Sequence, residues 1–213
     1  MFRPHPSRLL NEHFAAKPYQ GAQPEAARFI FIGLDANYAD DIEQSPIFQN
    51  LVAYHQNGPR FPQTNGTDYP FLLSEYKGDG RRYHLNFAKI GFTPQHAELV
   101  SFIELMDVPT VGRSQLTQQD LPRRHLERLR KAIFHGDANF VFLSAGVQRL
   151  MVSTGLFPEI LQVRRNFGAL RVLYEGDNRA VFLHLHLSNY GKFEQQRRAE
   201  ANEIAGLLAH VDA

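Results

Sequence analysis

Short, uninterrupted runs of apolar residues alternate along the chain with segments of helical spacing. The clearest runs are residues 29–32 (FIFI) and 140–143 (FVFL). A continuous run of this length is typical of a strand that is buried on both faces, as the strands of a parallel sheet are. Alternation of such strands with helices predicts a three-layer α/β/α fold around a central, mostly parallel sheet of four strands.

The other strands are predicted from weaker patterns. Residues 83–87 (YHLNF) fit the second strand of the sheet. Residues 170–174 and 180–187 flank a polar turn at 175–179 and fit a β-hairpin. The segment 58–82 is rich in Gly, Pro, Asn and Asp, and we expect it to be a long connection of the kind that often carries function.

Helices are predicted where a capping residue, often followed by proline, precedes apolar residues at helical spacing. In the helix expected after Thr93, the apolar face consists of Leu99, Phe102, Ile103 and Met106. The expected helices begin at Ser7, at Ser45, at Thr93 and at Asp120, or pass through residues 147–151 and 193–211.

The composition limits what kind of protein this chain can be. Its 213 residues are 43% hydrophobic and 21% charged, which is ordinary for a globular protein. We expect one domain over residues 1–213. The absence of cysteine excludes disulfides, cysteine nucleophiles and thiolate-bound metal centres. Neither a secretory signal nor a membrane-spanning run is recognisable, so the expected location is cytoplasmic.

The formal net charge of +1 is low for a protein that coats nucleic acid. A local basic face could still contact DNA phosphates, although arginines on solvated helix faces are the simpler interpretation. The basic residues concerned are Arg123, Arg124, Arg128, Arg130, Lys131, Arg164, Arg165, Arg197 and Arg198.

Polar side chains stand near the ends of several predicted strands. Asp35 follows the first strand, Asn86 lies near the end of the second, and His186 follows the last. Because ligands of open α/β sheets bind beyond the carboxyl ends of the strands, we expect these side chains to meet at one edge. A carboxylate, an amide and an imidazole suit acid–base chemistry on a small polar ring.

Five segments resemble motifs of uracil-DNA glycosylases, in the family's order and over nearly the whole chain. FIFIGLDANY resembles the first motif, a strand followed by Gly-x-Asp-x-x-Tyr, and HLSNYG resembles the second, which opens a DNA-inserting loop. PIFQNL, YHLN and FVFLSAG resemble the helix after the first motif and the two strands between the motifs. The resemblance implies the uracil-DNA glycosylase-like α/β fold and excision of a base that is flipped out of DNA.

The resemblance also implies roles for individual residues. Asp35 would position or activate water and offset positive charge on the sugar, and His186 would stabilise the departing base. Asn86 would bind the edge of uracil, and Tyr38 would exclude thymine. Further contacts are implied with the base, from Gly33, Leu34 and Ser188, and with the duplex, from Leu187, Asn189 and Tyr190. The expected partner is DNA, bound by a monomer away from any membrane, and no metal or other cofactor is implied.

The chain departs from the family pattern at three places, which bears on uracil specificity. Ala36 and Asn37 stand where the family commonly has Pro-Tyr before a histidine, and Leu187 replaces a proline of the second motif. No phenylalanine occurs in ADDIEQS, where one that stacks on uracil is expected. Phe48 and Phe71 are both candidates to replace it.

Other interpretations stay open. The same residues could be structural: Asp35 in a turn, Asn86 as a buried amide, Tyr38 in packing, and His184 with His186 as a pair on one strand face. That pair could also bind a divalent ion together with Asp35, as in a metal-dependent hydrolase. Finally, a glycosylase-like protein could have lost catalysis and kept nucleic-acid or nucleotide binding.

Overall fold

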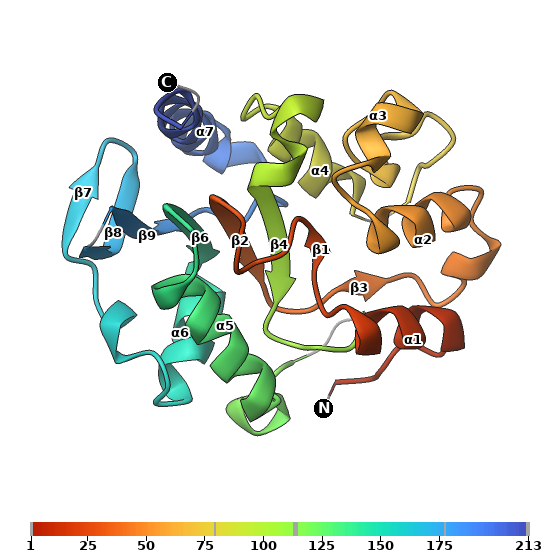
Figure 1. Cartoon of the computed structure of the whole chain (residues 1–213), viewed down its shortest axis with the longest axis horizontal. Coiled ribbons are helices and arrows are strands. Elements are labelled where there is room, and N and C mark those ends of the chain that lie inside the picture. The colour runs from red at the N-terminus through yellow and green to blue at the C-terminus, as the bar shows by residue number, and fades with distance from the viewer. Residues whose placement is uncertain (1, 79, 113–114, 177, 212–213) are drawn as a thin grey trace.

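The computed structural model describes residues 2–78, 80–112, 115–176 and 178–211. Within these ranges, seven strands form one mixed sheet in the order β1-β4-β2-β6-β9-β8-β7 (Figure 1). Two short strands, β3 (Asn37–Tyr38) and β5 (Thr110–Val111), form a separate parallel pair. The strands of the main sheet are β1 (Gln20–Gly21), β2 (Phe29–Gly33), β4 (Val100–Glu104), β6 (Phe140–Ser144), β7 (Arg165–Phe167), β8 (Leu170–Gly176) and β9 (Arg179–His184).

The four inner strands, β4, β2, β6 and β9, all run parallel to one another. Strand β1 extends the sheet antiparallel at one edge, and β8 and β7 extend it antiparallel at the other. The predicted α/β class is therefore confirmed, whereas the predicted sheet of four strands is wrong, because the described chain adds edge strands. Strands β1 and β7 have only two and three residues, too few for an apolar pattern to predict them.

The strand beside β2 is not the segment that the sequence pattern predicts. Residues 83–87 belong to helix α4 (Arg81–Ala88), and the strand is β4, which was expected to be helical. The apolar residues in 99–106 match helical spacing. In the structure β4 pairs with β2 and is buried along most of its length, so its side chains are apolar on both faces of the strand and the spacing does not indicate a helix. In α4, Asn86 is buried while Leu85 is 44% exposed, because a helix turns neighbouring side chains to different faces.

Helices cover both faces of the sheet (Figure 1). On one face, α5 (Arg123–His135) and α6 (Ala145–Ser153) share a hydrophobic core with Ile30 and Ile32 of β2. On the other face, α4 and α7 (Glu194–Ala209) share a core with Phe29 and Phe31, because side chains alternate along the strand. None of the described helices is both long and apolar enough to cross a membrane.

Several predicted elements are confirmed: β2, β6, α6, α7, the β8–β9 hairpin, and helix α1 (Arg8–Ala16) with Ser7 as its cap. Turn residue Asp177 of the hairpin lies outside the described residues, and β9 ends at His184 instead of at residue 187.

Other helix boundaries differ from the prediction. Helix α2 (Phe48–Gln56) begins after Ile47. The predicted cap Asp120 is instead the last residue of a short 3₁₀ turn that Thr117 caps, and α5 begins at Arg123. The expected connection 58–82 contains helix α3 (Phe61–Asn65) and a 3₁₀ turn at Pro70–Leu72.

Candidate active site

A cavity of about 350 Å³ lies beyond the carboxyl ends of β2 and β4. Its volume falls in the range of sites that bind small molecules. The predicted site residues Gly33, Leu34, Asp35, Tyr38 and His186 lie together in its wall. The other lining residues are Gln20, Ala36, Asn37, Phe71, Gly80, Tyr83, His84, Phe102 and Glu104.

Asp35 is oriented by a hydroxyl group from a distant part of the chain. Thr110 of β5 is fully buried and donates a hydrogen bond from Oγ1 to Asp35 Oδ2. Asn37 donates from Nδ2 to Thr110 Oγ1 at 3.0 Å and to the Gly112 carbonyl at 2.6 Å. Because β3 and β5 pair in parallel, these groups are held beside the turn that carries the acid.

The first residues of the chain hold β5 in turn. The His5 N–H donates to the Pro109 carbonyl at 2.9 Å, and the Val111 N–H donates to the Arg3 carbonyl at 3.1 Å. The strand that orients the acid is therefore fixed between β3 and the start of the chain. This contribution has no recognisable local pattern in the sequence.

His186 borders the cavity from the loop that follows β9. Ser188 donates to Nδ1 of its ring from the hydroxyl at 2.6 Å and from the N–H at 3.3 Å. Because a backbone N–H can only donate, Nδ1 accepts, and the neutral ring carries its proton on Nε2. Partial burial of the ring lowers the pKa of His186, so at neutral pH it offers an Nε2–H donor.

Three contacts fix the backbone of this loop. The Leu185 N–H donates to Oε2 of Glu200 in α7 at 2.8 Å. Asn86 of α4 donates from Nδ2 to the Leu187 carbonyl at 2.6 Å. The Leu187 side chain is 4% exposed and packs in the core that α4 and α7 share with the sheet. The imidazole therefore stands on a rigid support.

Two predicted roles do not fit this arrangement. Asn86 lies outside the cavity lining and uses its amide to hold the loop, because α4 is a helix and not the predicted strand. Leu187 cannot insert into a duplex while its side chain fills the core. Asn86 and Leu187 therefore support the loop, and Ser188, a predicted base contact, also lies outside the cavity lining.

Aromatic side chains form one wall of the cavity. The Phe71 ring stacks on His84, with centroids 4.7 Å apart and planes at 11°, and lies 6.3 Å from the ring of Tyr38. Arg81 fixes this segment by donating to the Phe71 carbonyl at 3.3 Å and to two carbonyls that follow it. Phe48 is instead buried in the core beside α1. Of the two candidates for a base-stacking ring, Phe71 is the one that lines the cavity.

Tyr38 closes the cavity at the side of α1. Its ring is buried, and its hydroxyl accepts a hydrogen bond from Gln20 Nε2 at 2.9 Å. Burial raises the pKa of Tyr38 well above its usual value, so the hydroxyl stays protonated. Packing and cavity lining are thus both roles of this residue.

Glu104 is a cavity residue that the sequence analysis did not single out. It ends β4, opposite Gly33 in the register of the parallel pair. Burial, and then the nearby Asp35, raise the pKa of Glu104 to about 8. The sequence does contain a pattern that points to Glu104, because this carboxylate directly follows an apolar run, as Asp35 does. That run, however, fits the helix predicted after Thr93.

The end of the loop after β9 is open to solvent. Tyr190 is 68% exposed, and the Arg82 guanidinium lies 4.4 Å from the centre of its ring. Ser188 is exposed and Asn189 is half-buried. An aromatic ring with a cation beside the cavity is an arrangement that can stack on a base and contact phosphate.

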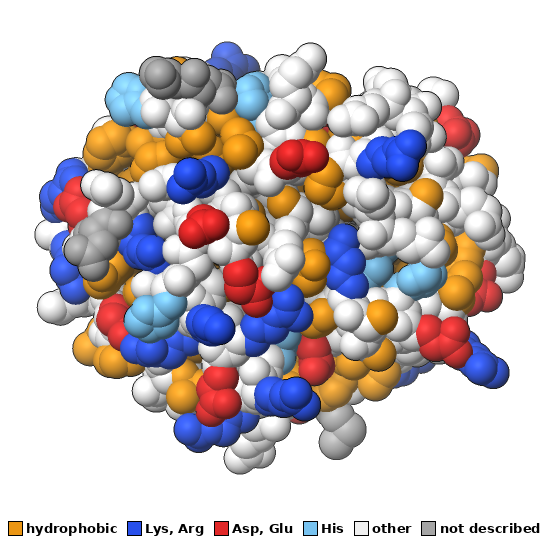
Figure 2. All heavy atoms as spheres, in the orientation of Figure 1, with side chains coloured by type: hydrophobic (Ala, Val, Ile, Leu, Met, Phe, Trp, Pro, Cys, Tyr) orange, Lys and Arg blue, Asp and Glu red, His pale blue; other side chains and the backbone are white. Residues whose placement is uncertain are grey.

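The basic stretches of the sequence do not form a bare positive surface. Figure 2 shows Lys and Arg side chains interspersed with Asp and Glu over the face that it presents. Ion pairs join Arg123 to Glu127, Arg128 to Glu25, Arg130 to Glu159, Arg165 to Glu175, and both Arg197 and Arg198 to Glu194. Arg165 lies in strand β7 and Arg197 is buried in α7, whereas the other arginines lie at exposed or half-buried helix positions, for which a solvated helix face remains the simpler interpretation.

The two histidines after β8 do not converge as a metal pair. His184 packs between Phe31 and Phe142 in the core and does not line the cavity with His186. Burial lowers the pKa of His184 to about 4, as expected for a core imidazole. Within the part of the chain that the structure describes, no three His, Asp or Glu side chains are grouped to hold a metal.

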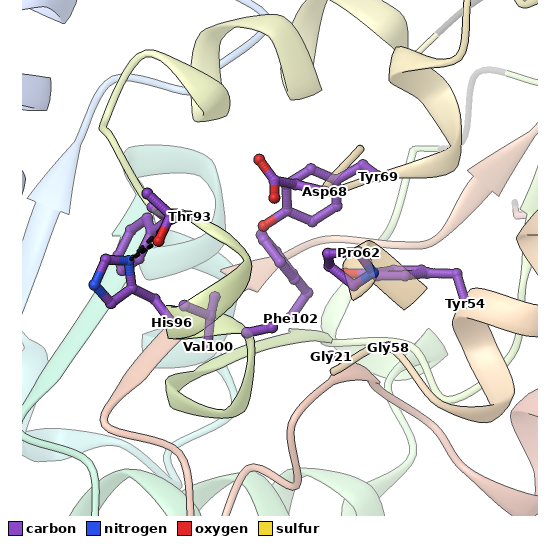
Figure 3. A pocket seen from close by; sticks show the side chains of 12 residues that line it. Gly21, Tyr54, Gly58, Pro62, Asp68, Tyr69, Thr93, His96, Val100 and Phe102 are labelled. Atoms are coloured by element: carbon purple, nitrogen blue, oxygen red, sulfur yellow. Dashed lines mark hydrogen bonds between the residues drawn. The ribbon is translucent and has the colours of Figure 1, made fainter. Parts of the chain in front are cut away.

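A second hollow lies between β4 and the segment 54–69 (Figure 3). Tyr54, Asp68, Tyr69 and His96 are among its lining residues. Its volume of about 20 Å³ accommodates roughly one water molecule, so it is too small for a nucleobase. This hollow is therefore not the candidate site.

Neither a known protein family nor a curated protein matches this sequence. Function must be inferred from the geometry. The cavity brings together an oriented carboxyl group, a neutral imidazole donor, a half-buried acid of raised pKa and an aromatic wall. Carboxyl groups in contrasting environments, with a donor opposite, are suited to cleaving a bond whose leaving group carries negative charge.

Proposed function

We propose that this protein hydrolyses the N-glycosidic bond of uracil or a related modified base in DNA, as the sequence resemblance implies. The observation that carries the proposal is that Asp35 and His186, from opposite ends of the chain, line one cavity. The cavity could accept a nucleotide that has been flipped out of the helix.

The reaction divides between these two side chains. The bond from the sugar carbon C1′ to the base nitrogen breaks, and its electron pair leaves with the base. The oxygen of a water molecule bonds to C1′, and Asp35 accepts the proton that this water gives up. The Asp35 carboxylate also offsets the positive charge that develops on the sugar.

His186 acts at the other end of the bond. Its Nε2–H donates to the oxygen of the base on which negative charge develops. The ring does so while neutral, because Ser188 fixes the tautomer and partial burial lowers the pKa of His186. The anchored backbone of the loop supplies this donor without reorganisation during the reaction.

Other residues in and beside the cavity supply the contacts with the base and with DNA. Phe71 supplies the ring on which the flipped base stacks, and Tyr38 closes the pocket behind it. Outside the cavity, the exposed Tyr190 and the neighbouring Arg82 take the place of the predicted wedge residue Leu187 as DNA contacts.

Strand scission by alkali after incubation with a uracil-containing oligonucleotide tests the proposal, because alkali cleaves DNA at the abasic site that excision leaves. Scission by the wild type should fall about 10²- to 10⁴-fold in Asp35→Asn. The matched control is Asp137→Asn, an exposed carboxylate before β6 and outside the cavity, which should keep full activity.

Wild-type protein that produces no scission on single-stranded, paired or mispaired uracil would contradict the activity on uracil. Binding of the same oligonucleotides at low salt without scission would instead favour the non-catalytic alternative.

A further inference from the structure

We propose that Glu104 binds the polar edge of the substrate base as a neutral carboxylic acid. The inference rests on the proposed function and deepens it, since it names the side chain that recognises the base by hydrogen bonds. The resemblance to uracil-DNA glycosylases implies this task for Asn86, whose amide instead holds the loop that carries His186.

The backbone on both sides of Glu104 is fixed. Its carbonyl accepts a hydrogen bond from His125 Nε2 of α5 at 2.8 Å, and the next residue, Leu105, donates to the Gly33 carbonyl at 3.0 Å. The Glu104 side chain lines the cavity, with its carboxyl group beside Gly33. A Cβ atom on Gly33 would lie 1.8 Å from Glu104 Oε2, so glycine leaves the space that the carboxyl group occupies.

The groups around this carboxyl offer it no positive charge. None of the described lining residues of the cavity is Lys or Arg. Asp35 faces it from the turn after β2, Tyr38 from β3, Tyr83 and His84 from α4, and His186 from the loop after β9. Burial lowers the pKa of His84 to about 3, which makes that ring neutral. Burial, and then the nearby Asp35, raise the pKa of Glu104 and so favour its protonated form.

A neutral carboxyl group presents one donor and one acceptor side by side. The pairing edges of nucleobases likewise place donors beside acceptors, and enzymes that flip a base read this edge by hydrogen bonds. An ionised carboxylate can only accept, so it would leave a carbonyl or ring nitrogen of the base unpaired. Loss of the proton should therefore end base binding.

The test compares Glu104→Gln with Glu104→Ala. An amide also presents a donor beside an acceptor but does not titrate in this range. Wild-type excision of uracil should fall about tenfold per pH unit above about pH 8, whereas Glu104→Gln should keep its rate there. Below about pH 8, Glu104→Ala should lose about 10- to 100-fold, chiefly through KM, because the base loses two hydrogen bonds, and its rate should lack the fall above about pH 8.

Two outcomes would overturn the proposal. One is a folded Glu104→Gln protein without activity, which would mean that Glu104 transfers a proton itself. The other is a Glu104→Ala protein that keeps the wild-type rate and pH profile. Circular dichroism and the melting temperature establish that each variant is folded.

Lys17 supplies the control for the alkaline limb, which is the fall in the excision rate above about pH 8. Burial lowers its pKa to about 8 as well, but its ammonium donates to the His55 carbonyl at 2.8 Å, outside the cavity. Lys17→Arg should leave the pH profile unchanged. If it removes the alkaline limb, that limb does not belong to Glu104 and the proposal is overturned.

Binding of free uracil, followed by NMR saturation transfer, separates this inference from the proposed function. Excision need not occur for this readout. Binding at about pH 7 that is lost at about pH 9 in the wild type, but kept in Glu104→Gln, supports the role of Glu104 even if no strand is cut. Failure of free uracil, adenine, guanine and cytosine to bind the wild type at about pH 7 overturns it.

Discussion

At the scale of single residues, the cavity depends on a close approach between Gly33 and Glu104. They face each other at the ends of β2 and β4, and only the missing side chain of Gly33 leaves room for the carboxyl group. The backbone of Gly33 does not need the left-handed region, so the requirement is one of space alone. A stability measurement can isolate that requirement.

Gly33→Ala should lower the free energy of unfolding by about 1–3 kcal/mol, because the added methyl overlaps the Glu104 carboxyl group. The double variant with Glu104→Ala should lose less than the sum of the two single changes. Urea denaturation measures all three proteins.

The matched control for that series is Gly146→Ala in α6, where the nearest atom to an added Cβ is 3.9 Å away. It should be neutral or stabilise by up to about 1 kcal/mol. Strict additivity of Gly33→Ala and Glu104→Ala would show that the two positions do not compete for space.

At the scale of elements, helix α4 and the loop after β9 form one unit through Asn86. Of the sheet and its helices, the apolar runs of β2 and β6 predicted strands correctly because these strands are buried on both faces. The same rule could not separate β4 from a helix, since Leu99, Phe102 and Ile103 fit both spacings. The sequence pattern predicted a strand where α4 lies and a helix where β4 lies. For this reason Asn86 was predicted to be a cavity residue, and Glu104 was missed.

Asn86→Ala should lower the free energy of unfolding by about 1–3 kcal/mol, because the buried Leu187 carbonyl loses its donor. Amide hydrogen exchange over residues 185–189 should speed up as the loop loosens. Asn139→Ala is the control: it removes a similar 2.9 Å hydrogen bond to a carbonyl at an exposed site and should cost less than about 0.5 kcal/mol. Unchanged exchange in Asn86→Ala would contradict the anchoring role.

At the scale of the whole molecule, burial of neutral histidines sets the response to acid. The pKa values of His55, His84 and His184 are lowered to about 4, 3 and 4 from the usual 6.5. Between about pH 6.5 and pH 4 the unfolded chain binds protons that the folded chain excludes, so stability is full above this window and falls as pH falls through it. Glu104 opposes the trend, because its folded pKa of about 8 is raised and favours folding at lower pH.

The free energy of unfolding should therefore decrease from about pH 6.5 to about pH 4, by up to about 1.4 kcal/mol per pH unit for each histidine. Urea denaturation at a series of pH values measures the slope. His184→Phe should make the slope shallower, since its neighbours Phe31 and Phe142 can pack against another ring. An equally steep slope in that variant would exclude His184 as a source.

The sequence predicted cavity residues correctly where a polar side chain comes shortly after a buried strand. Asp35 and His186 could be predicted because each stands just past an apolar strand, and the carboxyl ends of parallel strands share one edge. Phe71 was one of two candidate rings, and the sequence alone could not choose it over Phe48, while Thr110 could not be predicted at all, because the positions of both depend on long-range contacts such as those with Arg81 and Asn37. No local pattern encodes such long-range placement.

The backbone hydrogen bonds that join Arg3 to Val111 and His5 to Pro109, on either side of Thr110, have a practical consequence. Removal of residues 1–6 would take these bonds away and loosen the segment that places the Thr110 hydroxyl on Asp35. A variant that lacks these residues should therefore differ from the whole chain in any property that depends on the orientation of Asp35.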